Sequence, residues 1–251
     1  MKTGIIIVAA GSGERLGYGI PKAEVPLAGE PILAYALRGV IASGVADKIC
    51  VAVPRSDKLL RELCQDSSIT TPVGIDVECP PIVAVDGGST RSDSVRQGLA
   101  ALGDDVDVVL VHDAARALAP PEVFQRVAHA LAQGAQAVIP VRTMVDTVKV
   151  VEHAAADQVS IAQEVVKQTP DRTRLRIVQT PQGFTVEALT RAHASAELFD
   201  DEQSAAVTDD AMLIEALGIP VYAVPGSDLS LKITTPTDLV LAEALLNAYG
   251  S

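Results

Sequence analysis

Short apolar runs alternate with amphipathic stretches along this 251-residue chain, and this rhythm limits the folds open to it. The run at 108–111, Val-Val-Leu-Val, is apolar at every position, as expected of a parallel strand that helices cover on both faces. Strands that alternate with helical patterns are typical of βαβ units. The sequence therefore predicts a doubly wound α/β fold with a mostly parallel sheet.

An inserted β-arm interrupts this rhythm at about 142–179, where the pattern alternates weakly and contains no convincing ten-residue helix. Chains of this length are routinely one α/β domain, so we expect a single domain over 1–251 that carries the arm. Strands are expected at 4–9, 48–53, 82–85, 106–111, 137–141, 221–224 and 229–234. Helices are expected at 31–43, 90–102, 121–134, 186–198, 209–217 and 236–249, several of them after a proline or an N-capping residue.

The charge and the cysteines restrict the partners and the compartment. With 20 Lys and Arg against 32 Asp and Glu, the net charge of −12 argues against a nucleic acid or an anionic membrane as partner. The three cysteines form no CxxC pair, which suggests neither a disulfide framework nor a zinc site. No apolar stretch approaches the roughly 18 residues of a membrane span. We therefore expect a cytoplasmic protein without a nucleic-acid or membrane partner.

A glycine-rich segment, Ala9-Ala10-Gly11-Ser12-Gly13-Glu14-Arg15-Leu16-Gly17, directly follows the first predicted strand. Its GxGxxxG spacing is one residue too long for a dinucleotide fingerprint, and no Gly-Lys-Ser/Thr follows to make a Walker P-loop. Glycines let backbone N–H groups close around phosphates, while Arg15 and Lys22 add cations nearby. We interpret the segment as a phosphate-binding loop, with a purely structural turn as the alternative.

Two further places carry polar groups beside predicted strands. Asp113 follows an apolar strand, and ligands collect beyond the carboxyl ends of such strands, where one carboxylate can share a Mg²⁺ with a triphosphate. Capping of the next helix is the alternative role. The amides of Gly87 and Gly88, together with the Ser94 hydroxyl, are candidates for reading a base edge, although a plain helix start explains the same residues.

Five ordered blocks resemble the sugar-phosphate nucleotidylyltransferases and, among them, the 2-C-methyl-D-erythritol 4-phosphate cytidylyltransferase family. The resemblance spans nearly the whole chain and implies a Rossmann-like nucleotidyltransferase fold. The blocks are the loop at 9–17 with Pro21-Lys22, the turn 86–95 (Asp-Gly-Gly-Ser-Thr-Arg-Ser-Asp-Ser-Val), the segment 111–116 (Val-His-Asp-Ala-Ala-Arg), the segment 180–184 (Thr-Pro-Gln-Gly-Phe) and the segment 231–234 (Leu-Lys-Ile-Thr).

The resemblance implies a role for each matching residue. Arg15, Lys22 and Lys232 are expected to neutralise charge in the transition state, and Asp113 to hold Mg²⁺ or another divalent cation. Because the attacking group is already a phosphate anion, proton chemistry is little needed and His112 is interpreted as structural. The nucleotide contacts are expected from Ala10, Gly11, Gly13, Gly88, Ser89, Ser94 and Ala114, and the acceptor contacts from Thr147, Arg172, Thr180, Thr208 and Arg116.

The arm residues imply a dimer. Thr147 and Arg172 match residues that reach into the neighbouring subunit's site in the family, so the resemblance implies a homodimer joined through the arm. The implied reaction joins CTP to methylerythritol phosphate and releases pyrophosphate. Three alternatives stay open: a cytidylyltransferase for a pentitol phosphate such as ribitol 5-phosphate, a guanylyl- or uridylyltransferase, and a catalytically silent nucleotide-binding regulator.

Overall fold

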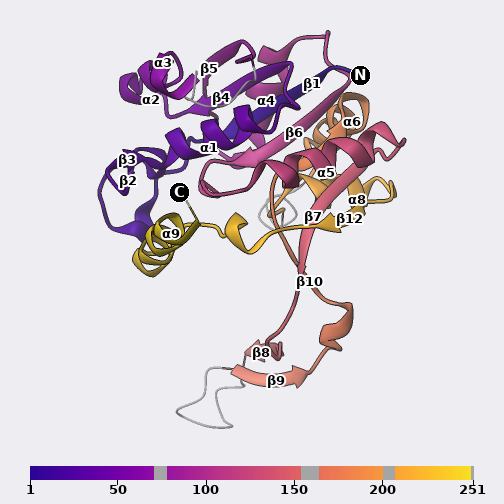
Figure 1. The fold of residues 1–251 in the computed structure, drawn as a ribbon. Coiled ribbons are helices and arrows are strands. Elements are labelled where there is room, and N and C mark those ends of the chain that lie inside the picture. Colours follow the sequence, from indigo (N-terminus) through magenta and orange to yellow (C-terminus); the bar gives the residue numbers. More distant parts are fainter. Residues whose placement is uncertain (71–77, 154–163, 200–206, 250–251) are drawn as a thin grey trace.

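The computed structural model describes residues 1–70, 78–153, 164–199 and 207–249. At its centre lies an eight-stranded sheet in the order β10-β7-β11-β6-β1-β4-β5, with β12 beside β7 (Figure 1). The pairs among β6, β1, β4 and β5 are parallel, and so is β12 with β7, whereas β10 and β11 run antiparallel to their neighbours. The mostly parallel α/β fold is thus confirmed. Its strands are β1 (Thr3–Val8), β4 (Lys48–Val53), β5 (Ile82–Asp86), β6 (Val108–Asp113), β7 (Ala137–Thr143), β10 (Arg176–Val178), β11 (Gln182–Thr185) and β12 (Tyr222–Pro225).

Helices cover both faces of the sheet, which explains why its strands are apolar on both sides. In β1, Ile5 and Ile7 pack into the core under α1 (Ile32–Ala42) and α5 (Pro121–Ala132). Ile6 points the other way, toward α4 (Arg91–Leu102), α6 (Val186–Ala196) and α8 (Asp210–Ala216). All three isoleucines are fully buried, as the period of two in a strand requires.

Smaller elements complete the body. A third apolar cluster joins α9 (Pro236–Tyr249) to the β2–β3 hairpin (Pro26–Leu27 and Glu30–Pro31). Among the described residues, no helix has both the length and the apolar character needed to cross a bilayer. The remaining elements are α2 (Lys58–Leu63), α3 (Ser67–Thr70) and the 3₁₀ turns η1 (Glu14–Leu16), η2 (Lys22–Glu24), η3 (Arg172–Arg174) and η4 (Asp228–Ser230).

One predicted element is wrong, and another is displaced. The strand expected at 229–234 is instead η4 followed by irregular chain, because its polar groups bond to the loop after β6. The Ile233 amide donates to the Ala115 carbonyl at 2.8 Å, and the Ser230 carbonyl accepts from Arg116 at 2.7 Å. The strand expected at 106–111 lies at 108–113, so Asp113 is its last residue.

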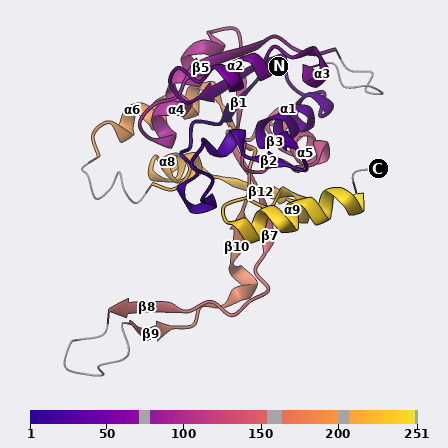
Figure 2. The ribbon, with the colours of Figure 1, turned by 90° about the vertical axis from the view of Figure 1, so that its left-hand side faces the viewer.

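The β-arm leaves the body as a two-stranded hairpin of β8 (Val150–His153) and β9 (Glu164–Gln168), seen in both views (Figures 1 and 2). Every residue of these two strands is exposed. Both ends of the range expected for the arm belong to the central sheet, because 141–143 of β7 pair with β10. The projecting part therefore begins after Thr143 and returns before Arg176.

Candidate active site

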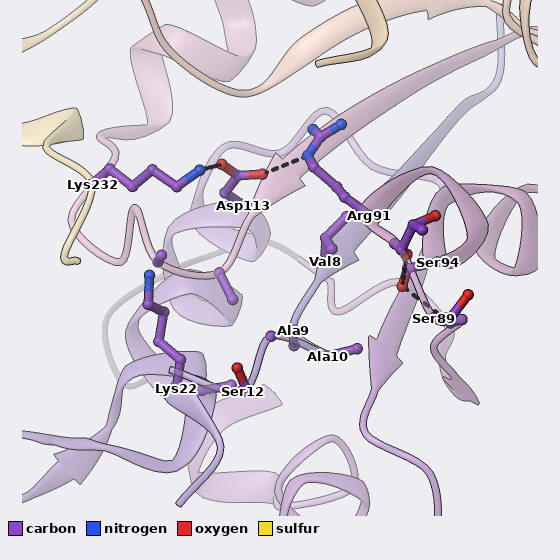
Figure 3. A pocket seen from close by; sticks show the side chains of 16 residues that line it. Val8, Ala9, Ala10, Ser12, Lys22, Ser89, Arg91, Ser94, Asp113 and Lys232 are labelled. Atoms are coloured by element: carbon purple, nitrogen blue, oxygen red, sulfur yellow. Dashed lines mark hydrogen bonds and ion pairs between the residues drawn. The ribbon is translucent and has the colours of Figure 1, made fainter. Parts of the chain in front are cut away.

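Three adjoining pockets lie beyond the carboxyl ends of β1 and β6. The central pocket, of about 450 Å³, is enclosed by the glycine-rich loop, the start of α4, the residues after β6 and Lys232 (Figure 3). The second pocket, of about 190 Å³, shares Arg91, Asp113 and Lys232 with it. The third, of about 400 Å³, is formed by 11–15 with Lys22 and Thr234. Shared lining residues join the three into one site.

The glycine-rich loop folds back tightly over Lys22. Gly13 has φ +71°, and a Cβ on it would lie 2.9 Å from the Cβ of Lys22, so only glycine fits there. The Lys22 amide donates to the Gly11 carbonyl at 3.1 Å and fixes the approach. The loop therefore presents Lys22 to the central pocket and Arg15 to the third pocket.

The cations of the site stand close enough to influence one another. Burial lowers the pKa of Lys22, and the charges of Lys232 and Arg15 lower it further. Lys22 and Ser12 face Asp113 and Lys232 across the central pocket (Figure 3). Such a concentration of positive charge is suited to a polyanion and costs free energy without one.

The start of α4 shapes another wall of the pocket. Thr90 caps the helix in a capping box with Asp93, and a Cβ on Gly88 would lie 2.0 Å from the Asp93 Cβ. Ser94 is 2% exposed; its hydroxyl accepts from the Gly88 amide at 3.1 Å and donates to the Thr90 carbonyl at 3.0 Å. The Gly87 amide donates to the Val53 carbonyl at 2.7 Å.

These bonds bear on one expectation from the sequence. The amides of Gly87 and Gly88 are both occupied within the chain, so in this structure they are not available to read a base edge. Ser94 lines the pocket while holding the turn in shape. A glycine pair in a sequence indicates close backbone approach, whether to a ligand or to the chain itself.

Asp113 stands at the centre of an ion-pair chain. Its Oδ1 accepts from Arg91 Nε at 3.2 Å, and its Oδ2 accepts from Lys232 Nζ at 2.8 Å (Figure 3). Burial alone would raise the pKa of Asp113, but these two cations hold it well below its usual range. The carboxylate is therefore ionised at neutral pH.

Arg91 is a residue that the sequence analysis missed. It lines both the central and the second pocket and pairs with Asp113 and with the buried Asp210. Its position within the block 86–95 could have indicated a place in the site. The two carboxylates it bridges lie 22 and 119 residues away in sequence, a relation that no local pattern reveals.

The second pocket gathers three residues expected at the acceptor, Thr180, Thr208 and Arg116. The Thr180 hydroxyl accepts from the Asp113 amide at 3.0 Å and lies 3.1 Å from His112 Nδ1. Arg116 donates to the carbonyls of Ser230 at 2.7 Å and of Val178 at 3.1 Å. Arg116 thus links the segments around Val178 and Ser230 beside this pocket.

His112 is fully buried against Phe124, with ring centroids 4.8 Å apart. Burial lowers its pKa to about 4, so the ring is neutral at pH 7. A buried, neutral ring packed on Phe124 fits the interpretation of His112 as a structural residue.

The structure brings most of the expected residues together and leaves two apart. Thr147 and Arg172 lie exposed on the arm and line none of the three pockets of their own chain. Arg172 Nη1 donates to the Val145 carbonyl, near Thr147 in sequence. The central pocket holds Ala10, Gly11, Lys22, Gly88, Ser89, Ser94, Asp113, Ala114 and Lys232, the second pocket Arg116, Thr180 and Thr208, and the third pocket Gly13 and Arg15.

Known proteins are similar to this chain in both sequence and fold. The family profile of 2-C-methyl-D-erythritol 4-phosphate cytidylyltransferase matches residues 3–248. Proteins of that name from Rhodococcus jostii and Streptomyces coelicolor are each 45% identical to the chain; the match covers 96% and 98% of this chain and 93% and 85% of theirs.

Solved structures of proteins named for this activity have a similar fold. That of the Thermus thermophilus protein of the same name is 33% identical with a TM-score of 0.72, over 98% of this chain and 100% of that one. The 4-diphosphocytidyl-2C-methyl-D-erythritol synthase of Anaerococcus prevotii has a TM-score of 0.77 at 28% identity, over 98% of each chain. With a family match across nearly its full length and the pockets described above, the chain belongs to the 2-C-methyl-D-erythritol 4-phosphate cytidylyltransferase family.

Proposed function

We propose a division of labour among the three pockets for the reaction of this family. The chain is a CTP-dependent nucleotidyltransferase that transfers a cytidylyl group from CTP to 2-C-methyl-D-erythritol 4-phosphate in isoprenoid precursor synthesis. The observation that carries the proposal is the meeting of Lys22, Lys232 and Asp113 in one pocket that opens to a cationic loop on one side and to Thr180 on the other. This arrangement suits a triphosphate and a second phosphate that approach each other.

The triphosphate lies along the glycine-rich loop. Arg15 and Lys22 neutralise its oxygens, and Ala10, Gly11 and Gly13 allow the backbone to approach it closely. The cytosine lies toward Gly88, Ser89 and Ser94, and Ala114 packs beside the nucleotide. Since the Gly87 and Gly88 amides bond within the chain, recognition of the base falls to other groups of this turn.

Asp113 is the candidate ligand of a magnesium ion or another divalent cation. The donor chemistry fits, because Mg²⁺ is bound through one or two carboxylates together with substrate phosphates and water. Asp113 is ionised, lines the central pocket, and has its Oδ2 held by Lys232, whose side chain is 44% exposed and can turn toward a phosphate. When bound, the ion would neutralise charge on the phosphates.

The bond changes follow an in-line displacement. A phosphate oxygen of the acceptor attacks the α-phosphorus, the new P–O bond forms, and the bond to the bridging oxygen of the leaving pyrophosphate breaks. Charge grows on the equatorial oxygens, where Arg15, Lys22 and Lys232 are suited to stabilise it without proton transfer. Thr180, Thr208 and Arg116 form the side of the site that receives the acceptor.

The arm completes the site of a second subunit. Thr147 and Arg172 are exposed on the arm and line none of the three pockets of their own chain, and a guanidinium offers the forked donors that a phosphate accepts. The hairpin also exposes apolar side chains, with Val151 at 43% and its strand partner Val166 at 56%. An isolated two-stranded hairpin is marginally stable at best, so a partner subunit is its natural cover.

The chain acts as one domain over 1–251 and works in the cytoplasm. Cys50, Cys64 and Cys79 are free thiols, which favours a reducing compartment. No nucleic acid or membrane takes part.

Pyrophosphate release tests the proposal directly. Each of the four nucleoside triphosphates is offered with methylerythritol phosphate and, separately, with ribitol 5-phosphate. We expect strong preference for CTP, because a site built to bond an exocyclic amine leaves buried groups unpaired with the wrong base. Equal turnover of CTP and UTP would contradict the base assignment, and faster turnover of ribitol phosphate would contradict the acceptor.

A further inference from the structure

Behind Asp113, the ion-pair chain continues into the interior of the protein. Arg91 Nη1 donates to Asp210 Oδ2 at 2.5 Å, and Asp210 Oδ1 lies 3.1 Å from His193 Nε2. The side chain of Asp210 is fully buried and that of His193 is 4% exposed. Neither residue lines any of the three pockets. Their connection to the central pocket runs through Arg91.

The helices that carry these ion-paired residues lie on one face of the sheet. Arg91 opens α4, Asp210 opens α8 and His193 belongs to α6, which packs against α8. Buried charge is expensive unless it is paired and hydrogen-bonded. Burial alone would raise the pKa of Asp210, but Arg91 and the hydrogen bond from His193 lower it, so Asp210 stays ionised.

The two oxygens of Asp113 have unequal partners. Oδ1 is held by Arg91, whose side chain is 25% exposed and is fixed at its far end by Asp210. Oδ2 is held by Lys232, whose side chain is 44% exposed and pairs with no second carboxylate in the described part of the chain. A guanidinium fork can bridge two carboxylates at once, which a lysine cannot do in the same geometry.

We propose that Arg91, Asp210 and His193 form a buried positioning chain that fixes Asp113 Oδ1 and leaves Oδ2 as the oxygen that exchanges Lys232 for a divalent cation. The proposal rests on the proposed function of Asp113. Asp210 balances the charge of Arg91, so the charge of Asp113 remains available to the cation once Lys232 turns to the phosphates. His193 holds Asp210 by donating from Nε2 to its Oδ1.

The test is a Mn²⁺ titration in which the electron paramagnetic resonance signal of the free ion reports binding. A CTP analogue with a methylene group between the α- and β-phosphorus is present, so that no reaction occurs. We expect Asp210→Asn and Arg91→Lys each to weaken Mn²⁺ binding about 10- to 100-fold, the usual effect of losing a group that orients a metal ligand. His193→Gln keeps a donor and should bind within about threefold of wild type, whereas His193→Leu should be weaker.

Asp105→Asn is the matched control. It removes the same charge, from a carboxylate that pairs with Lys2 at 3.7 Å before β6 begins, at the opposite end of the sheet. It should bind Mn²⁺ like wild type.

The outcomes separate the two proposals. If Asp113→Asn binds Mn²⁺ as well as wild type, the metal role of Asp113 is wrong. If Asp113→Asn loses binding while folded Asp210→Asn and Arg91→Lys keep it, the positioning chain is only structural and this inference is overturned. Should Asp210→Asn not fold, Arg91→Lys decides alone, because it keeps the charge and removes only the bridge between the two carboxylates.

Discussion

Thr180 and Arg172 are both expected at the acceptor phosphate, yet they occupy opposite surroundings. Thr180 is 4% exposed, and its hydroxyl is fixed by the Asp113 amide and lies beside His112. Arg172 is exposed on a short 3₁₀ turn of the arm, and its guanidinium bonds to the Val145 carbonyl. The body of the protein thus preorganises its part of the candidate site within one chain, whereas the arm presents an exposed cation.

This difference has a physical origin. Residues at the end of β6 are positioned by a sheet whose helices bury apolar side chains on both faces. The two strands β8 and β9 contribute no buried side chain, because all of their residues are exposed. A side chain on such an element gains a fixed position only when another surface covers it. Changes in the body should therefore damage chemistry, and changes in the arm should damage acceptor binding and assembly.

The largest effect is expected from Asp113→Asn. The substitution keeps the shape and removes the charge that Arg91 and Lys232 face. We expect kcat to fall by about 10³ or more, together with the response to Mg²⁺, since a metal ligand and a charge contact are lost at once. Steady-state rates over a range of Mg²⁺ concentrations measure this. An unchanged Mg²⁺ response would shift the metal role to another acid, with Asp209, which lines the second pocket, the first to examine.

Lys22→Ala should be the next largest change. We expect kcat to drop about 10² to 10³, the scale for one charge contact in the transition state. The thermal midpoint should not fall, because burial and the charges of Lys232 and Arg15 oppose the charged form of Lys22 in the free protein. Lys58→Ala is the control, since Lys58 is exposed on α2 and lines none of the pockets. A normal kcat in folded Lys22→Ala would leave the lysine without a catalytic role.

Arg172→Ala should act on the acceptor alone. We expect the KM for the acceptor phosphate to rise about 10- to 100-fold, the cost of one bidentate ion contact, with CTP binding nearly intact. Arg172→Lys keeps the charge but loses the fork and should recover only part of the affinity. Arg174→Ala, on the same 3₁₀ turn, is the matched control and also tests which arginine serves the acceptor.

Mixed dimers decide whether the arm acts in the neighbouring site. Subunits with Arg172→Ala and subunits with Lys22→Ala are combined after exchange has been verified. Random pairing makes half of the dimers mixed, and each mixed dimer has one intact site, so about a quarter of wild-type activity should return. No recovery would mean that the arm serves its own subunit or only assembly, and the contrast between body and arm would then concern stability alone.

The sequence predicts the body far better than the arm or the network behind the site. Apolar runs and caps indicate the main strands and helices because local patterns dictate them, and Thr90 caps α4 at the start of the helix expected there. The strand expected at 229–234 is wrong because its partners, such as Ala115, are distant in sequence. The series of ion pairs from Asp113 through Arg91 to Asp210 could not be predicted either, because its residues come from three elements that are distant in sequence.

The smallest effect on activity is expected at His112, in the body, where the measurable change is in stability against pH. Burial lowers the pKa of His112 from 6.5 to about 4, so between these values the unfolded chain binds a proton that the folded chain does not. The free energy of unfolding therefore rises with pH across this window, and the stability lost on going from pH 7 to pH 4 is about 3 kcal/mol for this residue. The lowered pKa of Asp113 acts in a separate pH window, since its contribution to stability is lost only as the pH falls below the usual range of an aspartate.

Denaturant unfolding at pH 7, 5.5 and 4 measures this effect. The free energy of unfolding should depend less steeply on pH in His112→Gln than in wild type. His129→Gln, altered at an exposed position on α5, should retain the full slope. Activity at pH 7 should change little, because a neutral ring gives up no charge there. Equal slopes for wild type and His112→Gln would show that another group governs the acid sensitivity of the body.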